Sequence, residues 1–459
     1  MPDRELGRWV RQARTNLRRR VARRNVGFVL SGGGSQGSFE AGVLKFIYDD
    51  LGLRPRSICG SSVGAIIAAK LAEGDDELTG RRAIDDVLAI WRGLRSNEDM
   101  WLAEPWLDKL RGQVAWASEL RGRAAAHGAA GSQARVVVRM LGEVVRRLPE
   151  SDGTIDALRQ AMRARSLLRM DPVRRLVEDN IHPERVVAST IRLRIGTVCL
   201  ETGDLQYITE EGALLSRDGT QLDVPNVRLQ DAILASASIP VIFPPTELGG
   251  NHYVDGGVRE ILPLELAFNR LDASHIFAVV ASAPGVEPMP DAGDRGLFDL
   301  ARRVSADIAP DETLRKEMQP PRGWGRRVSL VVPEFDVHDA LTIDASLIAA
   351  SLDYGYMRAA DVLLDLGDEQ SEITAEIARA RMRIREAEGP VLGLLLNPIL
   401  DNRSPEERER AIAKERARID RLVERRREVD APLPPGDCAP VPLAAAVESD
   451  APGLPAGGD

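Results

Sequence analysis

Cysteine, histidine and aromatic residues are scarce in this chain of 459 residues, and each shortage argues against a class of protein. The three cysteines are scattered and form no CxxC pair, which argues against a disulfide framework and fits a reducing compartment. The five histidines never fall at metal-ligand spacing, so no zinc site is expected. Aromatic residues make up 4% and the net charge is −9, a composition that argues against nucleic-acid binding.

Long hydrophobic runs are also missing. No stretch approaches the roughly 18 consecutive apolar residues of a membrane-spanning helix, and the N-terminus lacks the apolar segment of a secretory signal. We therefore expect a cytoplasmic protein. Hydrophobic residues at 44% are still enough for a sizeable core, and we expect one elaborated α/β domain.

Residues 1–24 form a basic arm that contains nine arginines. Trp9, Val10 and Leu17 interrupt the arginines, so the pattern predicts a short amphipathic helix. Such a helix can hold a protein on anionic lipid, which would make this one peripheral to the membrane. Because the apolar face is small, we favour the alternative, a solvated arm in front of the first strand.

Two strand–helix units follow the arm. Residues 26–30 and 56–59 are short apolar runs that read as buried strands, and each is followed by a glycine-containing turn. Residues 38–50 and 63–73 then have the pattern of helices. Strand, glycine turn and helix, repeated in this order, predict a parallel α/β sheet.

The predicted secondary structure of the rest of the chain changes twice, from helices to strands and back to helices. Residues 78 to about 178 are helical in pattern, and a charged helical segment with a capping box at Ser404 and Glu407 lies between 367 and 430. Between them we predict strands at 186–189, 191–199, 206–208, 247–257, 275–282 and 327–333. The predicted organisation is therefore a basic arm at 1–24, an α/β domain at 25–366 with a helical insertion at about 78–178, a charged helical extension at 367–430 and a disordered tail at 431–459.

Two glycine-rich turns carry candidate chemistry. The first joins a strand to a helix and contains Gly32, Gly33, Gly34 and Gly37; glycines there let backbone N–H groups point into a cavity at a helix N-terminus. The second, GSSVG at residues 60–64, matches the G-x-S-x-G nucleophile elbow. Gly60 and Gly64 flank Ser62 there because the turn is too tight for side chains. In this strand–turn–helix context we favour Ser62 as a nucleophile over a simple glycine-serine turn.

A serine nucleophile needs a base, and the histidines are poor candidates for it. His252 is the least implausible, but its position fits a turn residue better. Asp255 lies at the end of a predicted strand and is followed by Gly256 and Gly257, so its carboxylate can be presented into a cleft. On its own this sequence is also typical of an ordinary Asp-Gly turn.

Taken together and in this order, the three motifs resemble the patatin-like phospholipases. The resemblance extends from about residue 26 to residue 366, covers the helical stretch at 78–178 only loosely, and is supported by ASASIPVIFPP at 235–245 and by Gly355-Tyr356. It implies an α/β fold, the patatin-like three-layer sandwich, in which a mostly parallel central sheet is flanked by helices. The helical insertion and the helical C-terminal extension would be additions to that domain.

The resemblance also implies a catalytic dyad without histidine. By motif position Ser62 is the nucleophile, Asp255 is the general base, and the backbone amides of Gly32, Gly33 and Gly34 form the oxyanion hole. No cofactor and no metal are implied. The expected reaction is hydrolysis of a phospholipid, a lysophospholipid or another lipid ester through an acyl-enzyme. Because an ordinary aspartate has a pKa of roughly 4, the oxyanion hole is expected to carry much of the catalysis.

One residue departs from the family pattern. Family members often have Arg or Lys before the last glycine of the first loop, whereas this chain has Gln36. A positive charge is thus absent from that position, which bears on rate and head-group preference. Two alternatives stay open: a thioesterase or acyltransferase that uses the same dyad, and a catalytically silent lipid-binding protein.

Overall fold

The computed structural model describes residues 3–21, 24–105, 164–240, 242–286, 308–319, 323–389 and 404–436, with a few isolated positions besides. The predicted insertion is therefore described only at its two ends. His127 and most of the predicted tail lie outside the described residues.

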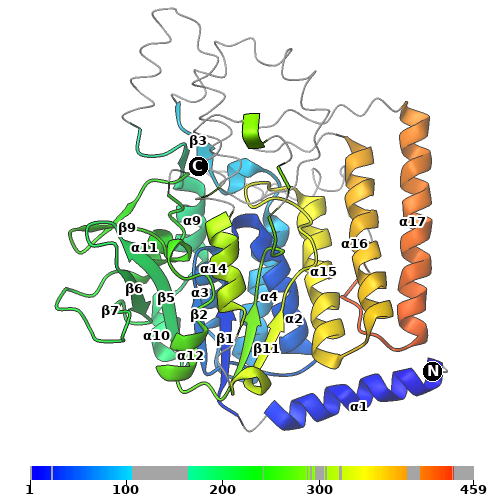
Figure 1. The fold of residues 1–459 in the computed structure, drawn as a ribbon, viewed down its shortest axis with the longest axis horizontal. Coiled ribbons are helices and arrows are strands. Elements are labelled where there is room, and N and C mark those ends of the chain that lie inside the picture. The colour runs from blue at the N-terminus through cyan, green and yellow to red at the C-terminus, as the bar shows by residue number, and fades with distance from the viewer. Residues whose placement is uncertain are drawn as a thin grey trace, which may run out of the picture.

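Within the described residues, a nine-stranded mixed sheet forms the centre of the molecule (Figure 1). Five strands in the order β11-β10-β1-β2-β5 are parallel. Antiparallel strands continue from β5, through β6 and β7 and through the pair β9 and β8. The strands are β1 (Val26–Leu30), β2 (Ser57–Gly60), β5 (Arg192–Cys199), β6 (Leu205–Thr209), β7 (Leu214–Ser216), β8 (Thr246–Leu248), β9 (Asn251–Asp255), β10 (His275–Val279) and β11 (Val328–Val331). The predicted α/β fold with a mostly parallel central sheet is confirmed.

Helices cover both faces of this sheet. Successive residues of a strand point to opposite faces, so Phe28 and Leu30 of β1 join one hydrophobic cluster while Val29 joins another. The first cluster also contains residues of α2 (Gly37–Asp49), α3 (Val63–Leu71), α4 (Glu77–Gly93), α9 (Asp171–Asn180), α11 (Leu229–Ser236) and α15 (Ala345–Leu364). The second contains residues of α12 (Leu264–Asn269) and α14 (Ala309–Glu317). Helix, sheet and helix thus form three layers.

The predicted helical extension forms α16 (Asp368–Glu388) and α17 (Pro405–Glu428), which stand beyond α15 on the side away from the sheet (Figure 1). The capping box is present: the Ser404 hydroxyl accepts from the Glu407 N–H at 3.2 Å, and the Glu407 carboxylate accepts from the Ser404 N–H at 2.7 Å. After α17 the chain turns back, Ala431 is buried, and the Pro432 carbonyl accepts from Arg426 at 3.1 Å.

The basic arm forms the helix α1 (Asp3–Val21), which lies where β1 begins, at the amino ends of the parallel strands (Figure 1). Its apolar side chains Val10, Leu17 and Val21 are buried in the main core. Arg14 forms an ion pair with Asp50 at 2.7 Å. Most of the apolar side chains that would enter a membrane are therefore already used for packing, although Trp9 stays exposed, and the arm is a packed helix and not the solvated arm that we favoured.

One predicted strand is wrong. Residues 186–189 belong to the end of α10 (Pro183–Ala188) and the residue after it. Proline at the first helical position and Glu184 in the first turn favour a helix start, and an apolar run of this length does not distinguish strand from helix.

Two short strands, β3 (Leu102–Ala103) and β4 (Leu168–Arg169), form a separate antiparallel pair beside the boundaries of the region that is not described. None of the helices in the described ranges combines the length and the apolar character that crossing a bilayer requires.

Candidate active site

The glycine-rich loop after β1 has a backbone that only glycine adopts readily. Gly32, Gly33 and Gly34 have φ angles of 73°, 157° and 59°. A Cβ on Gly32 would lie 2.3 Å from the carbonyl oxygen of Ser61 and 2.7 Å from Cβ of Ser62. The loop therefore passes directly against the turn that carries Ser62, as the motifs predict.

Ser62 occupies a strained turn between β2 and α3. Its φ of 56° and ψ of −134° are unfavourable for a residue with a side chain, and strain of this kind is typical of a nucleophile elbow. A Cβ on Gly60 would lie 2.5 Å from the carbonyl oxygen of Gly64, so neither flanking position leaves room for a larger residue. The Ser62 N–H donates to the hydroxyl of Ser236 at 3.0 Å, which ties the turn to α11.

Gly37 and Gly256 allow two further close approaches. A Cβ on Gly37, at the start of α2, would lie 2.7 Å from Val63. A Cβ on Gly256 would lie 2.5 Å from the backbone of Gly196 in β5. Both motif glycines thus hold the elbow and the aspartate turn against their neighbours.

Asp255 ends β9 and meets Ser62. Its carboxylate accepts from the Gly257 N–H at 2.8 Å, and Ser62 lies near enough to influence its pKa. Burial raises the pKa of Asp255 to about 6, although Ser62 and the Gly257 N–H lower it. The sequence suggests an ordinary aspartate with a pKa of roughly 4. The structure instead places the pKa of Asp255 close to neutral, which suits a general base.

The amides of the glycine-rich loop differ in what they bond. The Gly32 N–H donates to the Glu40 carboxyl at 3.3 Å. The N–H groups of Gly33 and Gly34 have no acceptor among the described residues. Two amides of the loop are thus without an acceptor in the part of the chain that the structure describes.

A loop around His338 holds the other end of the glycine-rich loop. The Ser35 N–H donates to the carbonyl of Ala340 at 2.9 Å, and the Gln36 side chain donates to the carbonyl of His338 at 3.2 Å. The His338 ring lies within 3.3 Å of the hydroxyls of Ser35 and Ser38. Gln36, the position that departs from the family pattern, is buried and helps to hold the loop.

None of the described histidines contacts Ser62. Each has a place elsewhere: His182 precedes α10, His252 pairs with Glu201 at 2.8 Å, His275 bonds Ser329 at 3.1 Å, and His338 bonds the serines of the glycine-rich loop. The sequence offers no histidine suited to be the base, and the described histidines agree with that interpretation.

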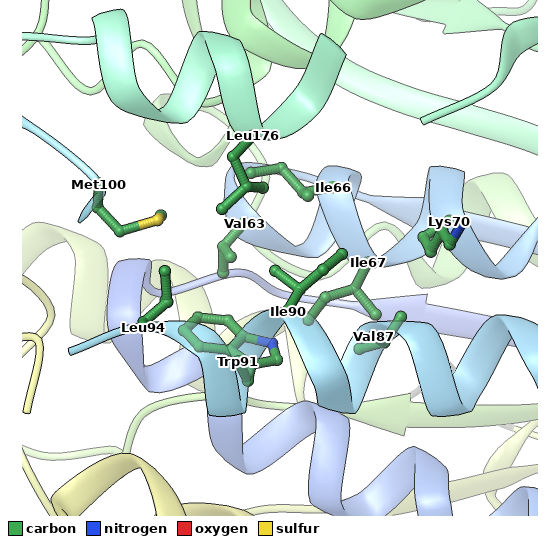
Figure 2. A pocket seen from close by; sticks show the side chains of 10 residues that line it. All are labelled: Val63, Ile66, Ile67, Lys70, Val87, Ile90, Trp91, Leu94, Met100 and Leu176. Carbon is green, nitrogen blue, oxygen red and sulfur yellow. The ribbon is translucent and has the colours of Figure 1, made fainter. Parts of the chain in front are cut away.

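An apolar pocket lies beside the nucleophile turn, between α3 and α4 (Figure 2). The pocket is narrow, with room of only about 20 Å³ for water-sized groups. Val63, the residue after Ser62, lines it together with Ile66, Ile67, Lys70, Val87, Ile90, Trp91, Leu94, Met100 and Leu176. Figure 2 shows Met100 and Lys70 at opposite ends of the pocket. Such a lining suits a hydrocarbon group.

Three residues around the site were not predicted from the sequence: Glu40, Ser236 and His338. Ser236 and His338 are brought to the site only by tertiary packing. Glu40 had one signal in the sequence, because it is an acidic residue inside the apolar pattern of the first helix after the glycine-rich loop.

Comparison with known proteins decides the family. The sequence pattern of the patatin-like phospholipase family matches residues 28–268, more than half of the chain and a range that includes Ser62 and Asp255. This chain belongs to the patatin-like phospholipase family. Membership in this serine hydrolase family implies lipid acyl hydrolase activity. No curated protein matches the chain in sequence.

Solved structures of low sequence identity resemble the chain. VipD from Legionella pneumophila is 14% identical, with 90% of this chain and 81% of that one covered and a TM-score of 0.32. Human GIVD cytosolic phospholipase A2 is 12% identical, with 64% and 52% covered and a TM-score of 0.27. ExoU of Pseudomonas aeruginosa, in its complex with SpcU, is 18% identical, with 92% and 76% covered and a TM-score of 0.21.

Proposed function

We propose that this protein hydrolyses lipid esters through an acyl-enzyme on Ser62, with Asp255 as the general base. The observation that carries the proposal is the strained turn that presents Ser62 against the glycine-rich loop, with the buried carboxylate of Asp255 near enough for Ser62 to affect its pKa of about 6. At neutral pH this aspartate is ionised and yet basic enough to accept a proton.

The reaction begins when Asp255 takes the hydroxyl proton of Ser62 and the serine oxygen bonds to the ester carbonyl carbon. The carbonyl oxygen becomes an oxyanion, which the N–H groups of Gly33 and Gly34 stabilise; one such donor is typically worth about 3–4 kcal/mol. The carbon–oxygen bond to the alcohol then breaks, and the proton held by Asp255 leaves with the alcohol. A water molecule, deprotonated by Asp255, attacks the acyl group and releases the fatty acid and free Ser62.

The apolar lining of the pocket beside Val63, not its volume, is our reason to favour a substrate with a hydrocarbon chain. Its lining is apolar except for Lys70, whose ammonium group forms ion pairs with Glu73 at 3.1 Å and Asp86 at 3.0 Å. Phospholipid and lysophospholipid esters combine such a chain with an ester carbonyl. We therefore favour these substrates over small water-soluble esters.

A fluorophosphonate probe tests the nucleophile. We expect the wild-type protein to be labelled in detergent and Ser62→Ala to lose all labelling. Ser57→Ala is the matched control, because Ser57 is also a buried serine and lies in β2, just before the elbow. An unlabelled wild-type protein would support a silent lipid-binding protein instead.

Product analysis tests the substrate class. Vesicles of phosphatidylcholine and of phosphatidylglycerol are incubated with the wild-type protein and with Ser62→Ala, and released fatty acids are measured. Fatty acid release by the wild-type protein alone supports the proposal. Release only from acyl thioesters, or acyl transfer to an added alcohol without hydrolysis, would instead identify a thioesterase or an acyltransferase.

A further inference from the structure

Glu40 is a fully buried acidic residue below the glycine-rich loop, in the first turn of α2. One of its carboxyl oxygens, Oε1, accepts three hydrogen bonds from the loop. They come from the Ser31 N–H at 2.9 Å, the Ser31 hydroxyl at 3.3 Å and the Gly32 N–H at 3.3 Å. Glu40 therefore helps to fix the point at which the loop leaves β1, together with the Val279 carbonyl, which accepts from the Ser31 N–H at 3.1 Å.

The other carboxyl oxygen of Glu40, Oε2, is buried without a hydrogen-bond partner among the described residues. Burial raises the pKa of Glu40 to about 8, although the bonds from Ser31 and Gly32 lower it. At neutral pH this carboxyl group is therefore mostly protonated and uncharged.

Charged groups on the elements around α2 are engaged with one another. Their pairs are Lys45 with Asp49 and Asp85, Lys70 with Glu73 and Asp86, Arg14 with Asp50, Asp344 with Arg385 and Asp353 with Arg381. His338, on the loop that packs against Ser35, has a pKa that burial lowers, so it is neutral as well. No described cation forms an ion pair with Glu40.

We propose that Glu40 is a positioning residue for the proposed reaction: its carboxyl group holds the Gly32 amide, so that the amides of Gly33 and Gly34 are turned toward the oxyanion. The inference rests on the proposed function of Ser62 and Asp255. It adds a residue that touches neither the substrate nor the nucleophile and acts through the loop.

The geometry explains why the neutral form matters. A Cβ on Gly32 would lie 2.7 Å from Cβ of Ser62, and the Gly32 N–H donates to Glu40. Gly32 therefore lies next to both the reacting serine and the carboxyl group of Glu40. A negative charge there would oppose the negative oxyanion across a buried, poorly screened space. The site therefore needs Asp255 charged and Glu40 uncharged, and their pKa values of about 6 and about 8 leave a window between them.

Labelling rate as a function of pH tests this proposal. We measure the rate constant for fluorophosphonate labelling from pH 5 to pH 9.5 in the wild-type protein, Glu40→Gln, Glu40→Ala and Glu317→Gln. The wild-type rate should rise through about pH 6 and fall through about pH 8. Glu40→Gln keeps a neutral acceptor for the loop, so it should retain the acid limb and the neutral-pH rate but lose the alkaline decline.

Glu40→Ala removes the acceptor, and its rate at neutral pH should fall about 10²-fold, the typical effect of a small displacement of catalytic groups. Glu317→Gln is the matched control. Glu317 is also largely buried, accepts two backbone N–H bonds, from Ile261 and Leu262, and has a pKa that burial raises to about 7. It lies away from the loop, so both limbs of its profile should match the wild-type profile.

Three results would overturn the proposal: a Glu40→Gln profile with the wild-type alkaline limb, a Glu317→Gln profile that loses this limb, or wild-type labelling in Glu40→Ala. If Glu40→Ala does not fold, the Glu40→Gln profile decides alone. Failure of the proposed function is a different result, because the wild-type protein itself would then not be labelled at Ser62.

Discussion

Asp361 and Asp344, the buried carboxylates where α15 meets α17 and α16, have arginine partners, whereas Asp255 and Glu40 do not. Asp361 in α15 faces Arg426 of α17 at 2.9 Å, and both side chains are fully buried. Asp344, at the start of α15, faces Arg385 of α16 at 2.6 Å. In this layer a fixed positive charge balances each of these acids, and the pairs join one helix to the next.

Asp255, at the carboxyl end of β9, and Glu40, in the first turn of α2, accept hydrogen bonds only from uncharged donors. Burial raises the pKa of each toward neutral pH. The difference shows how the same residue type serves two purposes. An acid held by arginine contributes structure, and an acid without a counter-charge can exchange a proton at the pH of the reaction.

Replacing Asp255 gives the largest expected effect. Asp255→Asn keeps the shape of the side chain but removes the base, so ester hydrolysis should fall about 10²–10⁴-fold. The melting temperature should not fall, because the substitution removes an ionisable group that is buried without a counter-charge. Hydrolysis assays and thermal melts at pH 7.5 measure both. If Asp255→Asn loses activity only because less protein is folded, then Asp255 serves structure, as Asp361 does, and the comparison fails.

For Asp361 of α15 we expect the reverse outcome, a loss of stability without a change in the labelling of Ser62. Asp361→Asn leaves Arg426 buried without its counter-charge, so the free energy of unfolding should fall by about 3–5 kcal/mol. Urea denaturation measures it. The folded fraction should still label at the wild-type rate, because Ser62 lies in another layer.

The double variant Asp361→Leu/Arg426→Met, which removes both charges, serves as the control and should recover most of the lost stability. If the single and double variants are equally unstable, the ion pair does not explain the stability of this layer.

The smallest expected effect is a dependence of stability on pH. The folded pKa of Glu40 is about 8 and its ordinary value is 4.5, so between these pH values the folded state binds a proton that the unfolded state has lost. The contribution of Glu40 to stability therefore decreases as pH rises through this window.

Thermal melts of the wild-type protein and Glu40→Gln at pH 5 and pH 8 isolate this contribution. The variant should gain several degrees on the wild-type protein at pH 8 relative to pH 5. A constant difference between the two proteins would show that Glu40 does not stay protonated in the fold.

The sequence predicted those parts of the fold and site that depend on local patterns. The strands around residues 26–30 and 56–59 and the capping box at Ser404 are short-range features, and the structure confirms them. The pairing of Ser62 with Asp255 came from motifs and a family resemblance, since nothing local connects residues so far apart. The helix at Pro183–Ala188 was missed because a short apolar run fits either element.

Tertiary context explains the rest of what was missed. The pKa of Asp255 depends on burial, which its neighbours in sequence do not determine. Ser236 and His338 reach the nucleophile turn and the glycine-rich loop only after α11 and the loop before α15 have packed. The burial of α1 follows from its contacts with α15 and α17, whereas its own sequence also fits a membrane-surface helix.

The position of α1 also determines which end of the sheet a charged surface bound to it would cover. Ser62 follows the carboxyl end of β2, while α1 precedes the amino end of its parallel neighbour β1, so the length of a strand, about 16 Å for five residues, separates them. An anionic surface that attracted the exposed Arg19 and Arg20 of α1 would therefore lie at the opposite end of the parallel strands from Ser62.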